Sequence, residues 1–158
     1  MRTRLLFIGG PIVAAALAAG LVVALARGSG AGPGDPAAFM TNLVEEIAAN
    51  DYATAWQTLH PAQQRIATRK AYISCESQSP IPGKLSSVRV VDISDEDVQV
   101  AGQEGTSAGK AVRVKLSISG LGDPVVLTHT GHAVAVGDHW TWILPPERFA
   151  EYKAGRCP

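Results

Sequence analysis

The sequence predicts an α+β fold that follows a single N-terminal membrane helix. Residues 5–26 contain no charged side chain, residues 35–78 place apolar side chains at helical spacing, and apolar residues alternate with polar ones beyond Lys84. Helices that come first and strands that come after indicate two to three helices packed on one face of an antiparallel sheet of about four strands.

The apolar segment of residues 5–26 is long enough to cross a bilayer. Its 22 residues span about 33 Å as a helix, against a hydrocarbon core of about 30 Å. Arg2 and Arg4 precede it, which favours a cytoplasmic N-terminus and a C-terminal domain outside the cell membrane. We prefer an uncleaved anchor, because the apolar core of a signal peptide spans about 7 to 15 residues. Cleavage after Ala26, which would secrete the domain, and a buried helix stay open as alternatives.

Three parts of the chain follow from this assignment. Residues 1–27 form the signal anchor, residues 28–34 a Gly/Pro linker, and residues 35–158 an extracytoplasmic domain. Three of the 14 basic residues lie in the first part, which leaves 11 against 14 acidic residues in the rest. A slightly acidic domain with scattered bases has no field to attract phosphates, so a nucleic-acid partner is excluded.

The helices are predicted in the following order. Asp35 and Pro36 start the first one, as N-cap and first helical residue. Asn50 or Asp51 caps the second helix, which ends before Pro61. Pro61 itself opens a third, shorter helix.

The strands follow after residue 84. Residues 85–94 form the first strand, with 97–102 as its continuation or its partner. Residues 110–119 alternate most clearly, and 123–136 and 139–144 complete the sheet around a tight Gly137–Asp138 turn. Residues 145–155 form a closing turn and a short helix.

The chain contains two cysteines, Cys75 and Cys157, and both lie on the side predicted to be oxidising. A structural disulfide is the expected state there. A shared metal is the alternative, but neither cysteine has a C-x-x-C partner or an adjacent histidine. His129 and His132 are three residues apart in a strand and point to opposite sides, so no metal site and no cofactor are predicted.

The helix pair joined by "NDYATAWQTLHP" and the final strand "GDHWTWIL" resemble the nuclear transport factor 2-like superfamily. This superfamily includes ketosteroid-isomerase-like enzymes and exported bacterial domains without enzymatic activity, and the resemblance covers residues 35–155. It implies a curved sheet that wraps a helix and leaves a cone-shaped cavity. Fold alone does not choose between catalysis and binding.

Trp140 and Trp142 point to one face of the last strand, and Trp56 and Tyr52 share a helical stripe. These four side chains are the candidate lining of a ligand pocket, although core packing is the alternative for the tryptophans. Isomerase-type catalysis needs a carboxylate inside such a pocket, and Asp92 is the first suspect. No catalytic residue is assigned.

The sequence therefore predicts a membrane-tethered, non-catalytic binding module that engages an envelope protein or a small apolar ligand. A secreted ligand-binding protein and an isomerase-like enzyme are the alternatives.

Overall fold

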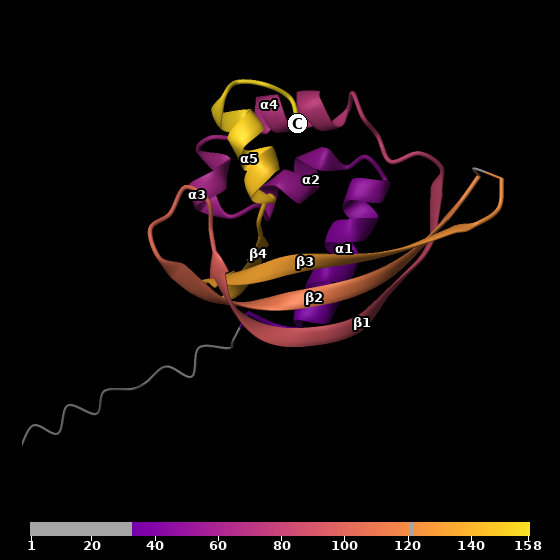
Figure 1. The fold of residues 1–158 in the computed structure, drawn as a ribbon, viewed down its shortest axis with the longest axis horizontal. Coiled ribbons are helices and arrows are strands. Elements are labelled where there is room, and N and C mark those ends of the chain that lie inside the picture. The colour runs from indigo at the N-terminus through magenta and orange to yellow at the C-terminus, as the bar shows by residue number, and fades with distance from the viewer. Residues whose placement is uncertain (1–32, 121) are drawn as a thin grey trace, which may run out of the picture.

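The computed structural model describes residues 33–120 and 122–158 and confirms the α+β architecture (Figure 1). The predicted membrane segment of residues 5–26 lies outside the described residues. Within the part that is described, no helix combines the length and the apolar character that a membrane crossing requires. In chain order the elements are α1 (Pro36–Ala48), α2 (Tyr52–Gln57), α3 (Pro61–Gln64), α4 (Arg69–Glu76), β1 (Lys84–Gln99), β2 (Thr106–Ser119), β3 (Val125–Val136), β4 (His139–Trp142) and α5 (Pro146–Lys153).

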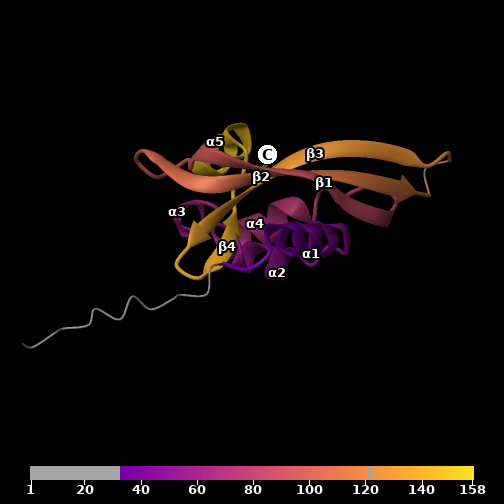
Figure 2. The ribbon, with the colours of Figure 1, turned by 90° about the horizontal axis from the view of Figure 1, so that it is seen from below.

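The four strands form one antiparallel sheet in the order β1–β2–β3–β4. Strands that are neighbours in the sequence are therefore also neighbours in the sheet. Figure 2 shows β1, β2 and most of β3 as one layer, with α1, α2 and α4 beneath it and β4 turned down beside these helices. The predicted number of strands, their antiparallel pairing and the helical cover are confirmed.

Two irregularities bend the long first strand. The register between β1 and β2 shifts between Leu85 and Ser87 and again between Val90 and Asp92. An extra residue in one strand of a pair kinks that strand and increases its twist. The sheet curves accordingly, and β1 runs without a break to Gln99, so the segment after residue 97 is its continuation and not a separate partner.

The first two helices begin where the sequence predicts. The Asp35 carboxylate accepts a hydrogen bond of 2.9 Å from the N–H of Ala37, and Pro36 occupies the first turn. Asp51 caps α2 by accepting a hydrogen bond of 3.1 Å from the N–H of Thr54. Both carboxylates satisfy backbone donors that have no partner inside the helix.

The single helix expected after Pro61 is instead two helices, α3 and α4. The hydroxyl of Thr68 accepts a hydrogen bond of 3.4 Å from the N–H of Ala71 and caps a new helix. A threonine side chain at this place competes with the continuing backbone ladder, which explains the break.

β4 ends at Trp142, two residues earlier than predicted. At this point its backbone turns to the connection between α2 and α3. The N–H of His60 donates to the carbonyl of Trp142 at 2.8 Å, and the N–H of Trp142 donates to the carbonyl of Thr58 at 3.0 Å. These bonds fix Trp142 between the sheet and the helices.

The core lies between α1 and the covered face of the sheet. Met40 and Leu43 of α1 and Val112 and Val114 of β2 are all buried. Gly131 of β3 permits the close approach, because a Cβ at this position would lie 2.8 Å from the sulfur of Met40. Helix α1 is thereby fixed against the middle of the sheet.

Cys75 and Cys157 form a disulfide with their Cα atoms 5.1 Å apart, as predicted. The bond joins α4 to the end of the chain beyond α5. It closes a segment with a sequence separation of 82, which stabilises the fold by about 4–5 kcal/mol on the chain-entropy account.

Candidate functional site

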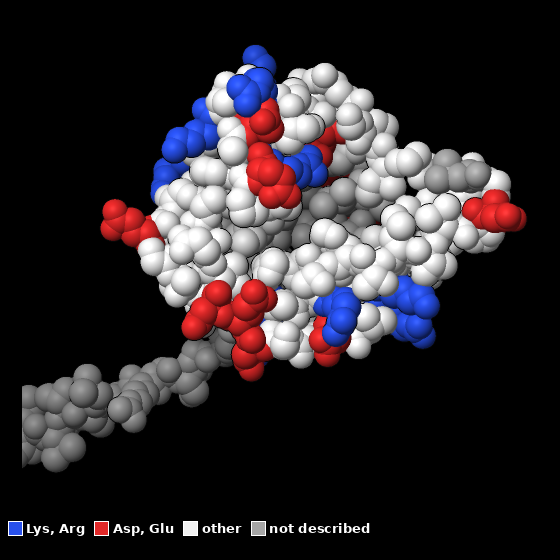
Figure 3. Space-filling view, viewed as in Figure 1, with Lys and Arg blue, Asp and Glu red and all other residues white. Residues whose placement is uncertain are grey.

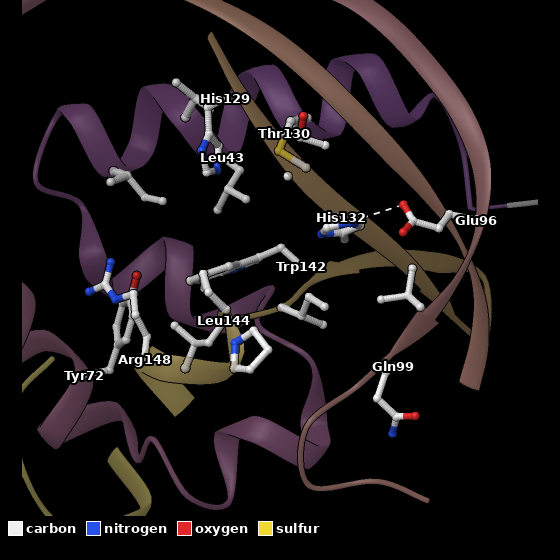
Figure 4. A pocket seen from close by; sticks show the side chains of 18 of the residues that line it. Leu43, Tyr72, Glu96, Gln99, His129, Thr130, His132, Trp142, Leu144 and Arg148 are labelled. Atoms are coloured by element: carbon white, nitrogen blue, oxygen red, sulfur yellow. Dashed lines mark ion pairs between the residues drawn. The ribbon is translucent and has the colours of Figure 1, made fainter. Parts of the chain in front are cut away.

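A cavity of about 590 Å³ opens between the sheet and the helices α4 and α5. The centre of the face in Figure 3 is hollowed at this place, and Figure 4 shows side chains that line it. Ordinary small-molecule sites have volumes of about 300–1,000 Å³. The cavity therefore has the size of a ligand site, and we take it as the candidate functional site.

Apolar side chains form most of the cavity wall. They lie on the stripe that helical spacing gives to α1 and in the segment that leads from β4 into α5. The stripe faces the cavity because the opposite side of α1 carries the polar residues. The apolar lining consists of Met40, Leu43, Val44 and Ile47 of α1, Val98 of β1, and Trp142, Ile143, Leu144, Pro145 and Pro146.

The end of the cavity at α4 and α5 is polar. Arg148 of α5 forms an ion pair with Glu76 of α4, and the hydroxyl of Tyr152 donates a hydrogen bond of 2.7 Å to the same carboxylate oxygen. The Glu76 side chain is 11% exposed. The Nε atom of Arg148 is buried without a hydrogen-bond partner in the described part of the chain.

Burial and the Glu76 charge shift the ionisation of this cluster. Burial alone would lower the pKa of the Arg148 guanidinium, but the hydrogen bond and charge of Glu76 raise it above its usual value. Burial, followed by the hydrogen bond to Glu76, raises the pKa of the Tyr152 phenol. At neutral pH the Arg148 guanidinium is therefore charged and the Tyr152 phenol is protonated.

Tyr72 of α4 lies at the same end and is 2% exposed. Its ring contacts Trp142 edge to face, with the ring centroids 6.0 Å apart. Burial, and then the nearby Glu76 carboxylate, raise the pKa of its phenol.

On the sheet side, His132 of β3 reaches Glu96 of β1 with 3.2 Å between Nε2 and Oε2 (Figure 4). The two strands are separated by β2, which places Ala111 opposite His132 and Gly109 opposite Glu96. These small residues leave room for the pair to meet across β2. Asp97 lies next to Glu96 on the rim.

His129 also borders the cavity, but the register places it opposite Val114, whereas His132 lies opposite Ala111. The two histidines are three residues apart on β3, and both border the same cavity. Among the described residues, no group of three or more His, Cys, Asp or Glu side chains is placed to hold a metal ion.

Of the four predicted lining residues, the structure places Trp142 on the cavity and the other three elsewhere. Tyr52 is buried and donates a 2.7 Å hydrogen bond to the side chain of Asn50. The indole of Trp56 donates to the carbonyl of Ala67 at 2.7 Å. The indole of Trp140 donates to the carbonyl of Gly34 at 3.0 Å. The two indoles bond to backbone carbonyls, Trp56 between helices and Trp140 at the start of the domain, whereas the Tyr52 hydroxyl bonds to a side chain.

Trp142 both borders the cavity and bonds into the core. Its ring borders the cavity, while its indole N–H donates to the carbonyl of Ala55 at 2.7 Å. Asp92, the suspected catalytic acid, lies outside the cavity and pairs with Arg113 at 2.7 Å. The carboxylates on the cavity are Glu76, Glu96 and Asp97.

Reasoning from the sequence missed Glu76 and Arg148. They are 72 residues apart, and neither belongs to a motif. The available signal was the cysteine pair, because Cys75–Cys157 brings the residue after Cys75 close to the last helix.

Comparisons with known protein families, with curated proteins and with solved structures find no match to this chain. The resemblance to the nuclear transport factor 2-like superfamily therefore stays a prediction. The function has to be argued from the cavity itself.

Proposed function

We propose that the chain is a non-catalytic, membrane-tethered binding module whose cavity takes a small apolar molecule. The observation that carries this proposal is the cavity of about 590 Å³, with its apolar walls and a few polar groups at two places on its rim. Such a combination of apolar surface and a small number of polar groups is typical of ligand sites.

The proposal is tested by filling the cavity. Val44 lines it from α1, so Val44→Trp reduces its volume. Val126 is exposed on β3, so Val126→Trp adds the same ring outside the cavity and serves as the control. We expect the full chain in lipid nanodiscs to bind 2-ethylnaphthalene by calorimetry, after subtraction of empty nanodiscs. Val44→Trp should abolish this binding and Val126→Trp should leave it unchanged; equal binding by both variants contradicts the proposal.

The tether and the extracytoplasmic location are supported by residues 5–26 and by the cysteine pair. A disulfide persists in oxidising compartments and is rare in the cytosol. Mass spectrometry of the mature chain is expected to find a mass that includes residues 5–26. A mature start at Arg27 would instead support the secreted alternative.

A protein of the cell envelope is the second candidate for the ligand. Val125, Val126 and Leu127 are exposed together at the start of β3, and exposed apolar patches favour protein contacts. Crosslinking in intact cells with a photoreactive residue at position 126 tests this candidate. A specific partner captured there, and lost in a Leu127→Ser variant, would support it.

The isomerase-like alternative is favoured by one arrangement, the pair of His132 and Glu96 on the rim. Their side chains are 33% and 46% exposed, however. A general base works best where water is excluded, so binding remains our proposal.

A further inference from the structure

The sheet extends past the helices at the end where β2 leads into β3. Figure 1 and Figure 2 both show this end beyond α1. Ser119 of β2 lies opposite Lys84 of β1, and its neighbour Ile118 lies opposite Val125 of β3. Three strands therefore reach this end together. We call it the distal end of the sheet, and it consists of residues 84–89, 115–120 and 122–128.

Apolar side chains are exposed on both faces of the distal end. Val125, Val126 and Leu127 have exposed fractions of 38%, 52% and 46%. Consecutive residues of a strand point to opposite faces, so Val126 lies on one face and Val125 and Leu127 lie on the other. A protein that packs on one face would leave the other face in water. The interface of a lipid bilayer, in contrast, surrounds the end of a sheet on both sides.

Two basic side chains lie directly opposite each other at the distal end. Arg89 of β1 pairs in register with Lys115 of β2, and both residues are exposed. Neither forms an ion pair within the described part of the chain. Like charges in opposite positions of a sheet are destabilising. A negatively charged surface would compensate for this repulsion, so the pair points to an anionic partner.

The other charges of the distal end are few. Lys84 is a third exposed base, although Glu45 of α1 borders the same shallow cleft and offsets part of its charge. Asp123, between β2 and β3, is the one acidic residue of the distal end. Three bases against one acid give a net charge of +2, whereas residues 28–158 as a whole carry 11 bases against 14 acids. The distal end is therefore positive in a slightly acidic domain.

We infer that the distal end docks on the surface of an anionic lipid bilayer. The three apolar side chains enter the interface, and Arg89 and Lys115 contact lipid phosphates. Apolar side chains next to basic ones are the combination that holds protein segments at such an interface. The inference goes beyond the proposed function and takes from it only the tether, which keeps the domain close to the membrane.

The chain enters the domain at the other end of the sheet. The indole of Trp140 is bonded to Gly34, and Trp140 pairs with Ala135 near the end of β3. The start of β2 lies at the same end, because Gly109 pairs with Val134. An anchored domain that also docks through the distal end would therefore lie along the bilayer and be held at both ends.

Lipid contact at the two ends of the sheet tests the inference. The full chain is placed in nanodiscs of phosphatidylcholine, with or without phosphatidylglycerol. A fluorophore is attached through Val126→Cys at the distal end or, as the control, through Thr106→Cys at the start of β2; the native cysteines are bonded to each other and do not react. Nitroxide-labelled lipid quenches a fluorophore that reaches the interface. We expect phosphatidylglycerol to increase the quenching at position 126 and to leave that at position 106 unchanged.

Charge variants assign the contact. Arg89→Gln and Lys115→Gln should each lower the docking equilibrium, measured from quenching of the distal fluorophore, by about 5-fold. Arg69→Gln and Lys70→Gln remove the same charge from exposed positions of α4 and should leave docking unchanged. Leu127→Ser removes apolar surface and should also weaken docking. Thermal unfolding checks that each variant is folded.

The possible outcomes separate a lipid partner from a protein partner. Quenching at position 126 that does not depend on phosphatidylglycerol, or that the α4 variants lower as much as Arg89→Gln and Lys115→Gln, would overturn the inference. A protein that is captured by the crosslinker at position 126 and lost in Leu127→Ser would overturn it as well, because the distal end would then bind a protein. Docking and naphthalene binding have separate readouts, so failure of one leaves the other standing.

Discussion

The hydroxyl of Tyr152 donates a 2.7 Å hydrogen bond to the carboxylate of Glu76, which lies 76 residues earlier in the chain. The bond joins α5 to α4, and the disulfide joins the residue before Glu76 to the end of the chain just beyond α5. Arg148 adds an ion pair to the same carboxylate. The polar end of the cavity is therefore held by covalent and polar links together.

The disulfide is expected to contribute a large part of the stability. In the full chain, Cys157→Ser should lower the free energy of unfolding by about 2–5 kcal/mol and the melting temperature by roughly 10 °C, because the unfolded chain regains its freedom. Thermal unfolding followed by circular dichroism measures the change. Reductant should lower the wild-type melting temperature and leave that of Cys157→Ser unchanged. A wild-type transition that is insensitive to reductant contradicts this prediction.

Glu76 is expected to stabilise the fold through its ion pair and its hydrogen bond. Glu76→Gln keeps the shape but leaves the partly buried Arg148 without its carboxylate, and the free energy of unfolding should fall by about 1–3 kcal/mol. Urea unfolding measures the loss. Glu151→Gln is the matched control, because Glu151 pairs with Arg156 at the surface and water screens that pair. Equal losses in the two variants would refute the special role of Glu76.

The two tryptophans of β4 are expected to differ in their contribution to stability. Trp142→Phe removes buried ring atoms and a hydrogen bond to Ala55, and should cost about 1–3 kcal/mol. Trp140→Phe removes an exposed hydrogen bond to Gly34 and should cost less. Chemical unfolding of both variants gives the comparison. A larger loss for Trp140→Phe would show that the two rings are assigned the wrong way round.

Stability is expected to fall on the acid side because of His60. Burial, and then the Arg65 charge, lower the pKa of His60, and its Nδ1 atom accepts a 3.2 Å hydrogen bond from the N–H of Ala62. Below the ordinary pKa of 6.5, His60 binds a proton more readily in the unfolded chain than in the folded chain. The free energy of unfolding therefore decreases as the pH falls. His60→Asn offers an oxygen acceptor that does not titrate. Urea unfolding at pH 7.5 and 5.5 should give a smaller difference for this variant, and an equal difference would exclude His60 as the source.

The fold was predictable from local patterns to a large extent. Asp35 and Asp51 are helix caps by chemistry that operates over three residues, and the alternation in β2 follows from the two faces of a strand. The break at Thr68 was not foreseen, because threonine also occurs inside helices and the sequence alone does not show that its hydroxyl caps a new one. The early end of β4 depends on backbone pairing with Thr58 and His60, which no periodicity encodes.

The site was predictable in part. The sequence identified the disulfide, since paired cysteines carry their own signal, and it named Trp142, which borders the cavity. Tyr52, Trp56 and Trp140 were also named as lining and do not border this cavity, because an aromatic stripe packs in a core as readily as it lines a pocket. The choice between these outcomes depends on which acceptor lies within reach of each aromatic side chain's donor, and that is decided by tertiary structure.

The hydrogen bond from Trp140 to Gly34 fixes the point at which the domain meets the preceding chain. If the chain is anchored through residues 5–26, the seven residues 27–33 extend over at most about 25 Å. This linker is shorter than the diameter of an ordinary domain of this size. The domain would therefore stay next to the membrane surface. Whatever fills the cavity would then be met at the lipid surface and not in the open fluid beyond.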